Sequence, residues 1–167
     1  MGLNFSVELK EVDESYPEEL TATEIAVYIS EKKALAFEAS PEQIIITADT
    51  IVAIDGEILG KPKDHQEAQE MLGKLSGKKH EVYTGVSINY EGKLTSFYDK
   101  TEVYCRVLNG EEINYYIETC KPFDKAGSYG IQDWFGLAVV EKLNGSYTNV
   151  MGLPTEKLYQ QLLTLVG

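Results

Sequence analysis

The stretch IIITADTIVAIDGEILGKPK, residues 44–63, decides how the chain must fold. Its first four residues, 44–47, are β-branched and uncharged, which predicts a strand buried on both faces. Asp49 follows shortly, and an unpaired buried charge is strongly unfavourable. Asp49 therefore needs a hydrogen-bond donor, a lysine or a metal as its partner. The dipeptide Asp55-Gly56 predicts a tight turn and a short hairpin between residues 51–54 and 57–59.

Outside this stretch, the hydrophobic pattern predicts strands alternating with helices. Phe5, Val7 and Leu9 alternate with polar residues, as in a half-exposed strand. The other expected elements are a helix from Thr21 or Thr23 through Glu38, a helix from Asp64 that stops at Gly77, antiparallel strands 80–90 and 93–107, a helix over 111–118 begun by Asn109 or Gly110, a loop over 121–130, a strand-like segment over 131–143, a loop over 145–152 and a helix from Pro154 through Leu162. This alternation predicts a mixed α/β domain in one piece.

Composition limits the class of protein. With 167 residues, 43% of them hydrophobic, the chain can bury the core of one domain. A net charge of −12 has the wrong sign for gripping a nucleic acid backbone, although lysines and backbone amides can still hold a small anion. No apolar stretch approaches the roughly 20 residues of a membrane span. The start lacks the features of a signal peptide, so we expect a cytoplasmic protein with neither nucleic acid nor membrane as partner.

Few residues carry recognisable chemistry. The loop DKAGSYGIQD, residues 124–133, has glycines that let backbone amides turn inward, with Lys125 as a charge and Gln132 as a two-way hydrogen bonder. Lys61, fixed between Gly60 and Pro62, can be aimed at a site. The alternatives are a structural turn and a solvated lysine. The two cysteines and the two histidines stand singly, which favours reduced thiols and structural imidazoles.

No motif of a serine or cysteine nucleophile or of a P-loop is found in the sequence. What the sequence offers is a carboxylate, several lysines and a glycine loop. This set fits metal-assisted attack of water on a phosphoanhydride, in which cations neutralise phosphate oxygens and a carboxylate activates water or holds the metal.

A series of short motifs adds a resemblance over nearly the whole chain. They are VDE at 12–14, Lys33-Ala34, ADT at 48–50, GKP at 60–62 with Asp64, LSG at 75–77, TGV at 84–86, Thr101 before Val103, DKAG-YGIQ at 124–132 and NV-GLP at 149–154. In this order they resemble the Maf family of nucleoside triphosphate pyrophosphatases. The resemblance implies a two-lobed α/β fold, a mixed sheet flanked by helices with a cleft between the lobes, similar to the inosine triphosphate pyrophosphatases.

The resemblance also implies an activity and a site. The activity is hydrolysis of a nucleoside triphosphate to the monophosphate and pyrophosphate, with a divalent cation such as Mg²⁺ or Mn²⁺. Carried onto this chain, the resemblance makes Asp49 the proton acceptor or metal-holding carboxylate and Glu14 a second acidic group at the metal. Lys33, Lys61 and Lys125 would contact phosphates, and Lys61 is counted among the catalytic groups. Asp64 would contact the substrate, and Thr50 and Gln132 would select the base. A homodimer is expected by analogy alone.

The substrate branch is inferred from one loop. YGIQ at 129–132 resembles the branch that acts on dTTP, UTP and some modified pyrimidine nucleotides. An amide at Gln132 can both donate to and accept from a pyrimidine edge. The alternatives are the same chemistry on 7-methyl-GTP and a nucleotide-binding or division-regulatory protein without turnover.

The start of the chain departs from the family pattern. Family members begin with a strand ending in S-x-S-P-R-R and a following helix, whereas this sequence begins at MGLNF, where that helix should be ending. The resemblance thus implies a single, N-terminally truncated domain over residues 1–167, without a central strand, a serine and two arginines of the phosphate site. Either the start codon was chosen too late or the chain is a degenerate relative with weak or absent activity.

Overall fold

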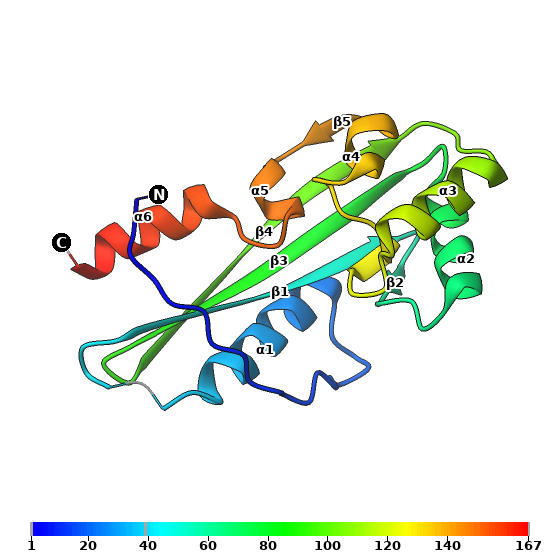
Figure 1. The fold of residues 1–167 in the computed structure, drawn as a ribbon. Helices are drawn as coiled ribbons and strands as arrows, with labels where there is room; N and C mark the ends of the chain where they lie inside the picture. The colour runs from blue at the N-terminus through cyan, green and yellow to red at the C-terminus, as the bar shows by residue number, and fades with distance from the viewer. Residues whose placement is uncertain (1, 39, 167) are drawn as a thin grey trace.

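The computed structural model of the chain describes residues 2–38 and 40–166. Within these residues five strands form one open sheet in the order β2-β1-β3-β4-β5, with every pairing antiparallel (Figure 1). The elements are α1 (Ala22–Leu35), β1 (Ile44–Ile54), β2 (Glu57–Leu59), α2 (His65–Leu75), β3 (Lys79–Tyr90), β4 (Lys93–Cys105), α3 (Gly110–Cys120), the 3₁₀ turn η1 (Ala126–Ser128), α4 (Trp134–Ala138), β5 (Val140–Asn144), α5 (Tyr147–Val150) and α6 (Thr155–Val166). The predicted α/β class, with helices flanking a sheet, is confirmed, but the sheet is antiparallel where the resemblance implies a mixed one.

Local signals at the helix starts and the hairpin turn are confirmed. Thr21 forms a reciprocal capping box with Glu24 at the start of α1, and Asn109 does the same for α3. The side chain of Asp64 caps α2. The turn Asp55-Gly56 has positive φ at both residues (52° and 82°), as a tight hairpin between β1 and β2 requires.

The strand predicted around Phe5 is wrong, and the strand predicted at 44–47 is confirmed as the start of β1 but not its burial on both faces. Phe5, Val7 and Leu9 lie in an irregular segment and are 84%, 75% and 96% exposed, because no strand of the described chain pairs with them and alternation alone cannot form a ladder. The start of β1 is not buried on both faces either, since Ile46 is 37% exposed. On its outer edge β1 pairs with β2 only from Val52 onward, so within the described residues no strand covers that edge earlier in β1.

The prediction for the segment after residue 130 is also wrong in part. The pattern indicates a strand-like segment over 131–143, but α4 occupies its middle and only β5 is extended. Short apolar runs do not distinguish a strand from a buried helix, and here Phe135 turns into the core instead of pairing in the sheet. Gly136 permits this turn, because a Cβ there would lie 1.7 Å from the carbonyl oxygen of Ile131. The predicted loop over 145–152 contains the short helix α5.

Helix α1 packs directly onto one face of the sheet. A Cβ on Gly85 of β3 would lie 2.3 Å from the backbone of Ala26, so only glycine allows this approach. Gly85 is the register partner of Asp49, and α1 therefore crosses the sheet next to that carboxylate. Ser30 fixes the crossing: its hydroxyl lies 2.7 Å from that of Ser87, and its backbone oxygen accepts from the Thr47 hydroxyl at 2.7 Å.

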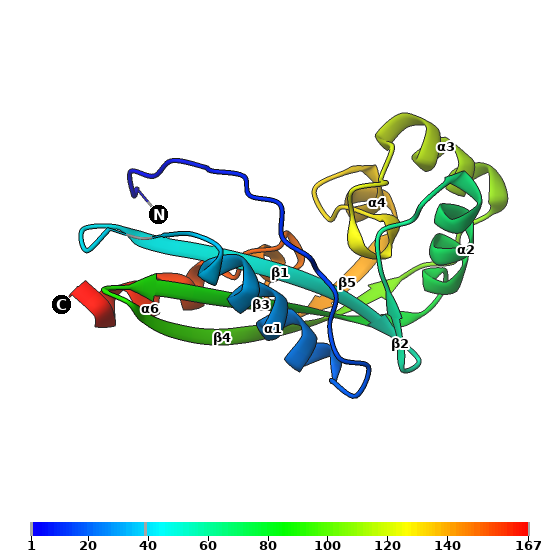
Figure 2. The same ribbon diagram turned by 90° about the horizontal axis from the view of Figure 1, so that it is seen from below.

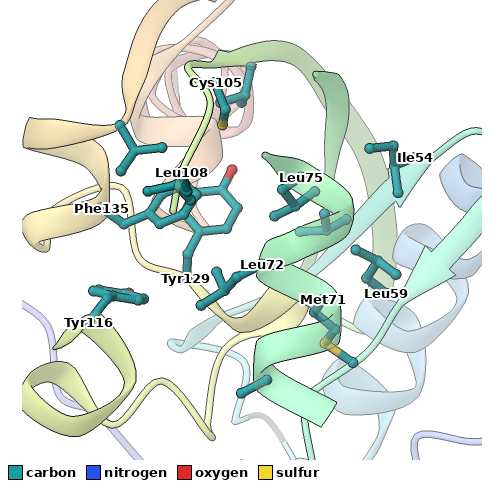
Figure 3. Packing of buried hydrophobic residues seen from close by; sticks show 14 of the residues in the cluster. Ile54, Leu59, Met71, Leu72, Leu75, Cys105, Leu108, Tyr116, Tyr129 and Phe135 are labelled. Atoms are coloured by element: carbon teal, nitrogen blue, oxygen red, sulfur yellow. The ribbon is translucent and has the colours of Figure 1, made fainter. Parts of the chain in front are cut away.

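The opposite face of the sheet carries two separate apolar clusters. At one end α2, α3 and α4 gather into a second lobe (Figure 2), whose core includes Tyr116 and Phe135 (Figure 3). Val82 of the sheet belongs to the same cluster. At the other end Leu158 of α6 packs on Val86. No helix in the described part of the chain is long and apolar enough to cross a membrane, and both cysteines are free.

His80 should make stability depend on pH. Its ring is 1% exposed, Nε2 lies 2.7 Å from the Tyr129 hydroxyl, and burial lowers its pKa from 6.5 to about 4. The unfolded chain therefore binds a proton below pH 6.5 that the folded chain excludes, and stability falls as pH falls. We expect about 2 kcal/mol to be lost between pH 7 and pH 5, measured by urea unfolding. The same loss in His80→Gln would contradict this assignment.

Candidate functional site

A cavity of about 300 Å³ lies between the sheet and the second lobe. Its walls include β1 with Asp49 and Thr50, the loop around Lys125 and Gln132, and the turn after α5 that contains Gly152. Lys61, which follows β2, lies at the same cavity. Of the sequence-predicted site residues, five are therefore brought together here.

Asp49 is held by an ion pair that extends to the other predicted charged groups. Its side chain is 12% exposed, and Lys33 Nζ of α1 lies 2.6 Å from Oδ1. The same ammonium lies 2.9 Å from Glu14 Oε1, and Lys61 Nζ lies 3.3 Å from the other oxygen of Glu14. The predicted need of Asp49 for a partner is thus met by a lysine.

The pKa values in this group follow from burial and pairing. Burial raises the pKa of Asp49 above its ordinary value, while the hydrogen bond and charge of Lys33 act in the opposite direction. The pKa of Glu14, which is more exposed, is lowered by its hydrogen bond to Lys33. Burial would lower the pKa of Lys33, but Asp49 and Glu14 outweigh it and the pKa rises. Asp49 is therefore a stronger base than an exposed aspartate, beside a permanently charged lysine.

The loop with Lys125 is attached to the sheet by a close contact. Gly127 has φ of 67°, and a Cβ there would lie 2.9 Å from a methyl group of Val52. Its backbone N–H donates to the carbonyl oxygen of Gly60 at 3.0 Å, which joins this loop to the segment that carries Lys61. Lys125 Nζ lies 3.1 Å from its neighbour Asp124. The glycine loop thus brings two lysines to one side of the cavity.

Thr50 and Gln132 stand apart from the charged group. Successive residues of a strand point to opposite faces, so Thr50 points away from α1 and toward the turn after α5. Its Oγ1 lies 2.9 Å from that of Thr84. Gln132 is exposed and lines the cavity. Asp64, by contrast, caps α2 by accepting from the backbone of Glu67 at 2.8 Å and does not line the cavity.

The donor set suits a hard divalent cation only in part. Glu14 and Asp49 supply carboxylate oxygens around the ammonium of Lys33, the ligand type that Mg²⁺ and Mn²⁺ accept. Among the described residues no group of three or more acidic, histidine or cysteine side chains could hold a metal ion. A cation here would need substrate phosphate oxygens to complete its coordination, as Mg²⁺ does in many nucleotide sites.

Some residues around the cavity had no predicted role. Thr84 and Asn149 lie within the quoted motifs, yet the sequence does not indicate that both are fully buried. Nor does it indicate that Thr84 links Thr50 to Asn149 by hydrogen bonds. A polar residue inside an apolar strand, as at Thr84, is the one signal that could have indicated this. Lysines, a buried carboxylate and glycine-rich backbone around one cleft define a site for a phosphorylated small molecule.

Comparison with known proteins identifies the family. The model of the family described as Maf-like protein matches residues 1–165. The dTTP/UTP pyrophosphatases of Phocaeicola vulgatus and Flavobacterium johnsoniae are 49% and 48% identical to the chain, each over 99% of it and 87% of their own length. That of Cytophaga hutchinsonii is 50% identical over 96% of the chain and 74% of its own length. The chain belongs to the Maf family.

Removing the charge of Lys33 should raise the pKa of Asp49 further. In Lys33→Gln the buried carboxylate loses the ammonium that now lowers its pKa. We expect the carboxyl carbon of Asp49, followed by NMR, to titrate at higher pH than in the wild type. Lys32→Gln is the matched control, because Lys32 contacts Asp13 and the Ser15 backbone instead. An unchanged titration in Lys33→Gln would show that the pair does not govern Asp49.

Gly127→Ala should loosen the loop that carries Lys125. The added methyl group meets Val52 and forces a non-glycine residue into positive φ, so we expect a loss of about 1–2 kcal/mol in urea unfolding. Gly60→Ala is the control, since nothing lies within 4 Å of a Cβ there. Equal stability of the two variants would rule out a constraint at Gly127.

Proposed function

We propose that this chain hydrolyses pyrimidine nucleoside triphosphates, dTTP and UTP above all, to the monophosphate and pyrophosphate. The observation that carries the proposal is the buried Asp49, paired with Lys33 at 2.6 Å, at a cavity that Lys61 and Lys125 also line. The relatives named dTTP/UTP pyrophosphatase, at 45–50% identity, support the substrate class.

The residues suggest how the reaction runs. Lys33 holds Asp49 through Oδ1, which leaves Oδ2 to accept a proton from water. The water oxygen forms a bond to phosphorus, the α–β anhydride P–O bond breaks, and pyrophosphate leaves with the bond electrons. Lys61 and Lys125 offset the charge of the phosphates. The raised pKa of Asp49 suits it to be the proton acceptor.

As the alternative role of Asp49, we propose that Asp49 and Glu14 hold a divalent cation, Mg²⁺ or Mn²⁺, in place of proton transfer to Asp49. Two carboxylates joined by one ammonium are the donor set on which this rests. Such a cation would supply further neutralisation of phosphate charge. Lys33 would then act as the group that keeps both carboxylates in place while substrate is absent.

For the base we propose the part of the cavity that Thr50 and Gln132 line. Thr50 and Gln132 are the polar side chains there that can meet a base edge without opposing charge. We do not assign Asp64 to the substrate, because its carboxylate caps the N-terminus of α2. The free cysteines suit a reducing cytoplasm as the place of activity.

Asp49→Asn tests the proposal. The amide keeps the shape of the carboxylate but cannot take the proton, so we expect pyrophosphate release from UTP and dTTP with Mg²⁺ or Mn²⁺ to fall at least 100-fold. The measured quantity is kcat/KM from a pyrophosphate assay. Asp64→Asn is the matched control, because asparagine is an equally good helix cap and activity should stay within about twofold.

Two results would contradict the proposal. One is wild-type release in the Asp49→Asn chain, and the other is a wild-type chain that binds UTP without releasing pyrophosphate. The second would favour nucleotide binding without turnover.

A further inference from the structure

A row of hydroxyls crosses the sheet between its two apolar clusters. On β1 and β3, Val52 and Val82 belong to the cluster of the second lobe, while Ala48 and Val86 pack with α6. Between them lie Thr50 and Thr84, which are register partners with their hydroxyl oxygens 2.9 Å apart. Thr84 is fully buried and does not line the cavity, whereas Thr50 does.

The hydroxyl proton of Thr84 is used in a hydrogen bond to the backbone. Thr84 Oγ1 lies 2.9 Å from the backbone oxygen of Asn149, and a carbonyl oxygen only accepts, so Thr84 must donate to it. A hydroxyl has one proton, and the contact with Thr50 can then be a hydrogen bond only if Thr50 donates to Thr84. The proton of Thr50 therefore points into the protein, and its lone pairs are left to face the cavity.

Asn149 is well placed to impose this arrangement. Its side-chain nitrogen donates to the Val82 carbonyl at 3.1 Å and to Thr101 Oγ1 at 2.9 Å, which fixes the residue to β3 and β4. Its backbone oxygen also accepts from the N–H of Gly152 at 2.9 Å. At Gly152 a Cβ would come within 3.4 Å of Thr50 Oγ1, so glycine leaves this oxygen open to a ligand.

We infer that Thr84 and the backbone of Asn149 fix Thr50 as a hydrogen-bond acceptor, so that the site selects bases that present a ring N–H. Uracil and thymine carry a proton on N3 and cytosine does not, and an acceptor at Thr50 therefore favours UTP and dTTP over CTP. This inference rests on the proposed function. Thr84 is a positioning residue in it, since it acts through Thr50 and touches no substrate.

Thr84→Val tests the arrangement directly. The methyl group keeps the shape of the side chain, and the Asn149 oxygen keeps its bond from Gly152, but the hydroxyl of Thr50 becomes free to turn and donate. We expect the ratio of kcat/KM for UTP to that for CTP to fall about five- to tenfold, chiefly through better use of CTP, the effect of about one hydrogen bond. Thr84→Ser, which keeps the hydroxyl, should restore the wild-type ratio.

Two controls separate selection from general damage. Ser87→Ala removes another buried hydroxyl of β3, one that contacts Ser30 and Ser96 on the α1 side, and should leave the ratio unchanged. In a Thr50→Val background, Thr84→Val should have no further effect on the ratio. Should Thr84→Val fail to fold, the wild-type chain gives the answer with 3-methyl-UTP, which lacks the N3 proton and should be used as poorly as CTP.

The outcomes distinguish this inference from the proposed function. Suppose that the wild-type chain turns over UTP. The inference alone is then overturned if Thr84→Val keeps the wild-type UTP:CTP ratio of kcat/KM, or if the wild type uses UTP and 3-methyl-UTP equally well. No turnover by the wild type overturns the proposed function. The inference is then decided by the dissociation constants of UMP and CMP, whose ratio should fall in Thr84→Val by the same factor.

Discussion

Consecutive residues of an extended strand point to opposite faces of a sheet, and at Asp49 and Thr50 of β1 this constraint divides the site in two. Asp49 faces α1, where Lys33 and Glu14 meet it. Thr50 faces the buried hydroxyl of Thr84. A one-residue slip of β1 on β3 would exchange the two faces, so the antiparallel register with β3 is what keeps charged chemistry on one side and polar selection on the other.

The packing around β1 serves this division. On one face the glycine at position 85 lets α1 approach the sheet backbone, which brings Lys33 within reach of Asp49. On the other face the apolar residues separate into two clusters, and the polar row between them lies under the turn after α5. The cleft follows from this break in the core, because the second lobe and α6 cover different ends of the sheet (Figure 2).

Much of the fold was predictable because its signals are local. Each signal depends on residues that are close together in the sequence. Examples are the capping residues Thr21 and Asn109, the turn Asp55-Gly56 and the apolar spacing of α2. The sequence predicted which chemical types of partner Asp49 could have, but it did not predict that the partner is Lys33. The exposure of Phe5 and the helix at α4 could not be predicted, since they depend on which strand has a neighbour and which side chain reaches the core. The link from Thr50 to Asn149 joins residues far apart in sequence and carries no periodic signal.

The most direct measurement is a crystal structure of the Asp49→Asn chain with UTP and Mg²⁺. We expect a nucleotide that lies across β1, with its phosphates toward Lys61 and Lys125 and with N3 of the uracil within hydrogen-bond distance of Thr50 Oγ1. A uracil bound away from Thr50, or phosphates bound away from these two lysines, would contradict this arrangement.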